Sequence, residues 1–263
     1  MLPKAKKRFG QHFLTDRHYL ARIVEAIEPR QGEAMVEIGP GTGILTDPLA
    51  SKVRPLHVVE IDRGLAAELR AKYPPDRVVV HEADALEFDF ASLPANLRVV
   101  GNLPYNVSTP ILFRIAAIAD RVRDCVFLLQ KEVVERMVAE PASAEYGRLS
   151  VMLQYRFAMA DVLHVPPGAF TPPPKVDSAV VRMQPLGSDR TRAKDEALFA
   201  RIVAAAFEQR RKTLRNAVRA LVADAAFITA GIDPKRRGET LGVAEFVKLA
   251  DATTTPLQRV RED

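Results

Sequence analysis

The chain of 263 residues has a single cysteine, Cys125, and no long uninterrupted apolar run. One cysteine excludes an intramolecular disulfide and a zinc site built from several cysteines, and its apolar surroundings predict a buried core thiol. No run approaches the roughly 18 apolar residues that span a bilayer, and the N-terminus turns polar before a signal-peptide core develops. We therefore expect a cytoplasmic protein with no membrane partner and no bound metal.

The composition is that of a globular protein. Hydrophobic residues make up 48% and charged residues 27% of the chain, which excludes disorder and collagen. The net charge of +5 is unevenly distributed, because residues 1–22 and residues 187–220 each carry a net +5. The rest of the chain is therefore acidic. Two basic segments on an acidic body indicate a polyanion contacted in specific places, although solvated faces would give the same charges.

Hydrophobic periodicity predicts an α/β fold followed by a helical tail. A helix is expected over about 16–28, with Asp16 as N-cap and Pro29 after its end. Apolar strand-like runs then alternate with helical patterns for some 110 residues, which predicts a doubly wound, mostly parallel, Rossmann-like sheet completed by strands near 157–165 and 178–184. We predict a catalytic domain over 1–186, with a basic arm at 1–15, and a small all-helical domain over 187–263. Prolines in the loop PPGAFTPPPK predict no regular structure there.

The ends of the first three strands carry residues suited to an adenosine-containing cofactor. Gly39 and Gly41 begin the turn GPGTG, where glycines let the backbone approach a ligand closely. Glu60 ends the second strand and can accept both ribose hydroxyls, and Asp84 ends the third and can accept the amine of adenine. The spacing G-x-G-x-G differs from the G-x-G-x-x-G of dinucleotide binders. It favours S-adenosylmethionine over NAD, and the alternative is a merely structural turn.

The fourth strand ends in the sequence GNLPY at 101–105. An aromatic amino group is a poor nucleophile because its lone pair is delocalised, so a site that methylates it needs hydrogen-bond acceptors that orient it. The Asn102 side-chain oxygen and the Leu103 carbonyl can accept the two N–H groups, while Pro104 stiffens the turn. Tyr105 offers a face on which an extruded base can stack. We interpret this turn as the catalytic site.

Several motifs together resemble those of the ribosomal RNA adenine dimethyltransferases, of the KsgA type that modifies small-subunit RNA. The resemblance covers nearly the whole chain and includes these stretches: QHFL at 11–14, EIGPGTGILT at 37–46, VVEID at 58–62, ADAL at 83–86, GNLPYNVSTP at 101–110, YGRLSVMLQ at 146–154, VPPGAFTPPPKVDSAVV at 165–181 and FEQRRKTLRN at 207–216. It implies a class I methyltransferase that transfers two methyl groups from S-adenosylmethionine to N6 of each of two adjacent adenines in the 3′-terminal hairpin of 16S ribosomal RNA. The partner it implies is this RNA within an immature 30S subunit. We take the enzyme to be a monomer.

The resemblance also implies roles for individual residues. Besides Gly39 and Gly41, the cofactor contacts fall on His12, Leu14, Glu60, Asp84 and Asn102. At position 12 the family usually has asparagine, but a neutral histidine still offers one donor and one acceptor, so we expect the contact to survive. Phe170 is expected to sandwich the flipped base against Tyr105, although it could instead be a core residue that anchors the loop. Lys175 is a candidate phosphate contact.

A group of cations in the tail is a second candidate RNA contact. Arg210, Arg211, Lys212 and Arg215 are predicted to crowd about one and a half helical turns without acids at i+4 spacing. We interpret them as phosphate contacts, with a solvated helix face as the alternative.

Other functions fit the sequence less well. A zinc-dependent base deaminase is excluded, since H-x-E and P-C-x-x-C are absent. A protein-glutamine methyltransferase would share the Asn-Pro-containing turn but lack the arginine group. Methylation of large-subunit ribosomal RNA and a non-catalytic ribosome-assembly factor stay open as alternatives.

Overall fold

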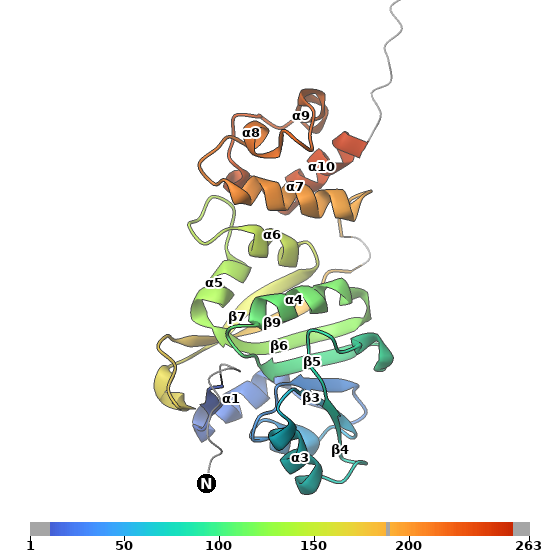
Figure 1. Ribbon diagram of the computed structural model, residues 1–263, viewed down its shortest axis with the longest axis vertical. Helices are drawn as coiled ribbons and strands as arrows, with labels where there is room; N and C mark the ends of the chain where they lie inside the picture. The colour runs from blue at the N-terminus through green and yellow to red at the C-terminus, as the bar shows by residue number, and fades with distance from the viewer. Residues whose placement is uncertain (1–10, 188–189, 255–263) are drawn as a thin grey trace, which may run out of the picture. The chain divides into compact units, whose positions relative to one another are not determined.

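The computed structural model describes residues 11–187 and 190–254, so most of the predicted basic arm lies outside the described residues. The chain forms two compact units (Figure 1). The first comprises 1–135 and 156–185, and the second comprises 136–155 and 186–263. The division at 185/186 matches the predicted boundary within one residue. Residues 136–155, which were predicted to belong to the catalytic domain, instead join the helical unit because Tyr146, Val151 and Tyr155 are buried in its core.

The first unit is built on the predicted sheet. Its seven strands have the order β4-β3-β2-β5-β6-β9-β7, and β9 runs antiparallel to both of its neighbours. The strands are β2 (Met35–Ile38), β3 (Leu56–Glu60), β4 (Val78–Glu82), β5 (Leu97–Asn102), β6 (Val122–Gln130), β7 (Phe157–Val165) and β9 (Ser178–Pro185). Chain order reverses between β2 and β5, and a crevice for ligands forms at such a switch point, beyond the carboxyl ends of the strands.

Helices connect these strands as the periodicity predicted. They are α1 (Arg17–Ile27), α2 (Thr46–Ala50), α3 (Arg63–Lys72), α4 (Ser108–Ala117) and α5 (Lys131–Val138), with short 3-10 turns η2 (Phe90–Ser92) and η3 (Ala119–Arg121). Ile23 and Ile27 of α1 pack into one core with alternate strand residues such as Val58 and Val100. The intervening residues Val59 and Val99 are buried as well, so these strands are covered on both faces. Cys125 in β6 is fully buried, as predicted.

The segment just before α1 is tied to the proline-rich loop. Strand β1 (Phe13–Leu14) pairs antiparallel with β8 (Phe170–Thr171), and η4 (Pro167–Ala169) precedes β8. The backbone N–H of Thr15 donates to the Ala169 carbonyl at 2.8 Å. The prediction of an irregular loop was therefore wrong for 167–171, because the chain there finds backbone partners in a distant segment that sequence periodicity does not reveal. Asp16 caps α1 as expected, accepting from the backbone of His18 and Tyr19.

The second unit is all helical. It contains α6 (Arg148–Gln154), α7 (Glu196–Glu208), α8 (Leu214–Val218), α9 (Asp224–Ala230), η5 (Gly238–Thr240) and α10 (Val243–Thr254), and the last turn of α5 belongs to it. Its core gathers Phe199, Phe227 and Phe246. Among the described residues, no helix of either unit has the length and apolarity to cross a bilayer.

A buried ionic network fixes the start of β5. The Arg98 guanidinium bonds Glu33 at 2.7 Å and both Asp124 oxygens at 2.7 and 2.8 Å, and it also donates to the carbonyls of Ile27 and Glu28. The Arg98 side chain is 5% exposed and that of Glu33 is 9% exposed. Water therefore screens this network little, and each partner is needed to compensate the others.

Arg98→Ala should accordingly lower the free energy of unfolding by about 3–5 kcal/mol, because it leaves Asp124 without its cation and Glu33 with Arg123 alone, in a poorly solvated place. Urea unfolding followed by circular dichroism measures the change. The control is Arg70→Ala, which breaks an exposed 3.0 Å pair with Glu82 and should cost at most about 1 kcal/mol. Equal losses in the two variants would contradict a larger contribution of the buried network than of the exposed pair.

Candidate cofactor and target-base site

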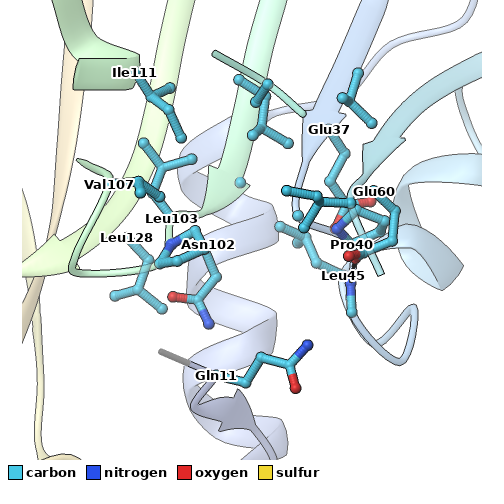
Figure 2. Close-up of a pocket in the computed structure, with 18 of the residues that line it drawn as sticks. Gln11, Glu37, Pro40, Leu45, Glu60, Asn102, Leu103, Val107, Ile111 and Leu128 are labelled. Atoms are coloured by element: carbon cyan, nitrogen blue, oxygen red, sulfur yellow. Dashed lines mark hydrogen bonds between the residues drawn. The ribbon is translucent and has the colours of Figure 1, made fainter. Parts of the chain in front are cut away.

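A cavity of about 320 Å³ opens at the switch point of the sheet. Its walls come from the ends of β2, β3 and β5, from the turns that follow them and from residues 11–14. Figure 2 shows Asn102, Leu103 and Leu128 on one side of it and Glu37, Pro40 and Glu60 on the other. The volume lies within the range of small-molecule sites. The predicted residues at three strand ends thus meet in one place.

The glycine turn and Glu60 form one wall. Gly41 adopts a φ of 57°, and a Cβ there would lie 3.2 Å from the Phe13 ring, so both conformation and space favour glycine. The buried Glu60 carboxylate accepts the Gly41 N–H at 3.1 Å and the Asp62 N–H at 2.9 Å. Burial raises the pKa of Glu60, and these two hydrogen bonds oppose the rise. Each oxygen keeps acceptor capacity that suits a pair of ribose hydroxyls.

Asp84 lies two residues beyond β4 and also lines the cavity. Its Oδ1 accepts the Leu86 N–H at 2.8 Å, which holds the carboxylate in an Asx turn. No described residue donates to Oδ2, so this oxygen can take an amine. The residues present therefore fit an adenosine-containing cofactor: glycines floor the cavity, Glu60 faces the ribose position, and Asp84 can read the base.

The turn at 101–105 begins where β5 passes close to β2. A Cβ on Gly101 would lie 2.3 Å from the Ile38 carbonyl oxygen, so only glycine permits this approach. The Asn102 Nδ2 donates to the His12 carbonyl at 3.1 Å, which leaves Oδ1 as an acceptor without a donor among the described residues. The Leu103 N–H donates to Leu128 at 3.1 Å. The Asn102 side-chain oxygen is thus available as an acceptor on this turn, and the need for Gly101 was not predicted.

The ring of His12 lies against Tyr105. The two ring centroids are 5.5 Å apart with an interplanar angle of 23°, and the Tyr105 hydroxyl bonds the Ser178 hydroxyl at 2.6 Å. His12 Nδ1 is 2.9 Å from the Pro172 carbonyl oxygen. His12 and Tyr105 line the cavity, as does Leu14, which is buried. One face of the Tyr105 ring is therefore covered by a side chain of the protein.

Two predicted residues of the proline-rich loop lie elsewhere. Phe170 is 3% exposed, belongs to the hydrophobic core that includes Leu14, and does not line the cavity. The prediction that it sandwiches the base is not supported by this arrangement, because its pairing across β1 and β8 turns the ring into the core. The alternative of a core anchor describes it better. Lys175 is exposed, consistent with a phosphate contact or with a solvated lysine.

Glu37 in β2 was not predicted as a site residue. This residue lines the cavity, is 1% exposed, and accepts the Thr46 hydroxyl at 2.7 Å. Burial raises its pKa to about 8, and the nearby Glu60 adds to the rise. A charged residue inside the apolar strand AMVEIG was the signal that could have revealed it.

The four cations of the tail do not share one helix. Residues 209–213 form a turn between α7 and α8, so only Arg215 is helical. Arg210 donates to the carbonyls of Ala144 and Tyr146 at 3.0 and 3.2 Å and pairs with Glu239 at 3.4 Å. Arg215 is ion-paired with Asp224.

Arg211 and Lys212 are exposed, and in the part of the chain that the structure describes neither has an ion-pair partner. The prediction of four unbalanced cations on one helix was therefore wrong. The acids that pair with Arg210 and Arg215 are Glu239 and Asp224, which lie further along the chain than the i+4 positions.

The model of the family described as "Ribosomal RNA adenine dimethylase" matches residues 2–255 of the sequence. The chain belongs to the ribosomal RNA adenine dimethylase family. It is 60% identical over 248 residues to the ribosomal RNA small subunit methyltransferase A of Aromatoleum aromaticum, covering 94% of each chain. To the protein of the same name from Thiobacillus denitrificans it is 58% identical over 241 residues, covering 92% of this chain and 94% of the other. The predicted methyltransferase activity and its cofactor, S-adenosylmethionine, are confirmed by this membership.

Solved structures of similar fold agree with this family. A dimethyladenosine transferase from Plasmodium falciparum superposes with a TM-score of 0.79 at 24% identity, over 90% of this chain and 96% of the other. The 23S rRNA methyltransferase ErmE gives 0.70 at 26% identity, over 92% of this chain and all of the other. The predicted Rossmann-like methyltransferase fold is confirmed.

The buried Glu37 makes the stability of the dimethylase depend on pH. Its folded pKa of about 8 exceeds the unfolded value of 4.5, so the folded protein keeps a proton that the unfolded chain releases, and its contribution to stability falls as the pH rises between those values. Glu37→Gln does not titrate and should raise the free energy of unfolding at pH 7 by on the order of 3 kcal/mol.

Urea unfolding at several pH values measures this gain, which should vanish below pH 4.5, where the carboxyl is protonated in the unfolded chain as well. The exposed Glu68→Gln is the control and should change stability little at any pH. A gain independent of pH would show that the proton on Glu37 is not its origin.

Proposed function

We propose that this enzyme transfers two methyl groups to N6 of each of two adjacent adenines in the 3′-terminal hairpin of 16S ribosomal RNA. It acts as a monomer in the cytoplasm, on the RNA within an immature 30S subunit. Relatives that share 53–60% identity carry the name ribosomal RNA small subunit methyltransferase A, which supports the small subunit over the large one. The observation that carries the proposal is the Asn102 side-chain oxygen, which accepts from no described residue, on a turn that lines the adenosine-compatible cavity.

The cofactor's sulfonium supplies an electrophilic methyl group when bound. Glu60 would accept hydrogen bonds from the ribose hydroxyls, Asp84 would accept one from the adenine amine of the cofactor, and Gly39 and Gly41 would let the backbone pass close to it. Leu14 and His12 line the cavity from the N-terminal segment. These residues would hold the cofactor beside the end of β5, which lines the same cavity.

The chain's own residues then orient the target amine. Asn102 Oδ1 and the Leu103 carbonyl accept its two N–H groups, which turns the nitrogen lone pair out of conjugation with the ring. Tyr105, held by Ser178, supports the base from one face. Positioning of the two reactants supplies most of the acceleration, so no strong base is required. Lys175, Arg211 and Lys212 contact phosphates.

The proposed function is tested with 30S and 50S particles that lack these methyl groups, incubated with enzyme and isotopically labelled S-adenosylmethionine. Mass spectrometry of RNA digests should locate dimethyladenine at two adjacent positions near the 3′ end of 16S RNA. Label in 23S RNA would instead favour the large-subunit activity. Absence of label in both would leave the binding-only assembly factor.

Asn102→Ala should reduce methyl transfer at least about tenfold more than it reduces RNA binding, because only the acceptor at the reacting amine is removed. Single-turnover rates and equilibrium binding to the same 30S particles separate the two effects. Gln184→Ala is the control, since it removes an exposed side-chain amide that does not line the cavity. If turnover of Asn102→Ala stays within a few-fold of the parent, the role of this turn is refuted.

Replacing Arg211 and Lys212 together by alanine should weaken RNA binding and reduce its salt dependence by about 0.7–0.9 log units for each phosphate that is no longer neutralised. The double variant Arg63→Ala/Arg70→Ala removes two cations that share Glu82 and should leave the slope unchanged. Binding measured across a salt series decides the matter. An unaltered slope in Arg211→Ala/Lys212→Ala would show that both residues are solvated and contact no phosphate.

A further inference from the structure

His12 connects three parts of the site at once. Its backbone carbonyl accepts from Asn102 Nδ2 at 3.1 Å, its ring stacks on Tyr105, and its Nδ1 lies 2.9 Å from the Pro172 carbonyl oxygen. A carbonyl oxygen only accepts, so Nδ1 carries the proton in this contact. The side chain is therefore held in a defined orientation over the tyrosine, by a stack and by a hydrogen bond.

The position of this ring conflicts with the position that the target base needs. A base that reaches the Asn102 carboxamide must use the part of Tyr105 that faces the cavity, and the half-buried Tyr105 is fixed there by its hydroxyl bond to Ser178. The His12 ring stacks on this tyrosine, and His12, Tyr105 and Asn102 line the same cavity. Imidazole and adenine are both flat nitrogen heterocycles, so one can stand in for the other on an aromatic face.

We propose that the His12 imidazole is a placeholder for the target adenine, and that the base displaces it from Tyr105 during entry. This inference rests on the proposed function. Displacement breaks the stack and the Nδ1 hydrogen bond to Pro172, while the backbone contact to Asn102 is kept. The ring therefore acts as a positioning residue that competes with the substrate, and it selects against groups too weakly stacking to replace it.

Three variants separate the ring from its hydrogen bond. His12→Phe keeps a stacking ring but loses the donor to Pro172, His12→Asn loses the ring but keeps an amide donor, and His12→Ala loses both. Competition by the ring predicts that KM for unmethylated 30S particles falls in His12→Asn and His12→Ala, and that it stays closer to the parent value in His12→Phe, which keeps the stack. Aromatic pairs imply a change of about two- to tenfold in KM for loss of the ring. The S-adenosylmethionine dissociation constant, measured by calorimetry, separates cofactor effects from these changes.

The stack itself is tested without substrate. In protein labelled at histidine ¹³Cε1, the His12 signal, assigned from His12→Asn, should carry a ring-current shift that Tyr105→Leu removes. Its absence would overturn the inference. With the shift present, equal KM values in all variants, or higher KM in all of them as a structural role predicts, would also overturn it. If the parent enzyme methylates no ribosomal particle, the proposed function fails and the inference falls with it, whereas a methylating parent with unresponsive KM removes the inference alone.

Discussion

The site depends on the close passage of two neighbouring parallel strands. At Gly101 the backbone of β5 comes so near to the Ile38 carbonyl that no side chain fits between them. This contact brings the glycine turn after β2 and the Asn102 turn after β5 to one edge of the sheet. A Cβ at Gly39 would lie 3.7 Å from the Asn102 carbonyl oxygen, so cofactor floor and catalytic turn are in van der Waals proximity. Methyl donor and acceptor can therefore be held together by backbone placement.

Burial of carboxylates is the second constraint. Glu37 and Glu60 lie at adjacent strand ends with little exposure, and burial raises the pKa of each. Glu37 therefore keeps its proton at pH 7, and the two carboxyl groups offer hydrogen-bond partners for the hydroxyl groups of a ligand. The start of β5 has a different arrangement, since Arg98 there bonds Glu33 and Asp124.

Local pattern predicted much of this arrangement. Each strand of the seven-stranded sheet and the first helix lie where periodicity and capping placed them, and Glu60, Asp84 and Asn102 converge because the ends of parallel strands share an edge. Contacts between segments that are distant in the sequence could not be predicted from local pattern. Phe170 turns into the core because β8 pairs with a strand more than 150 residues earlier. Arg210 is drawn to carbonyls of Ala144 and Tyr146, and no spacing rule links those positions.

The lone cysteine has a practical consequence. Cys125 is enclosed in β6 with no exposed surface, and burial raises the pKa of its thiol well above the usual value. The thiolate that reacts with oxidants and maleimides is therefore scarce and inaccessible in the folded protein. A cysteine introduced on an exposed residue becomes the sole labelling position, so a fluorophore can be placed on either unit of the natural sequence without first removing a thiol from its core.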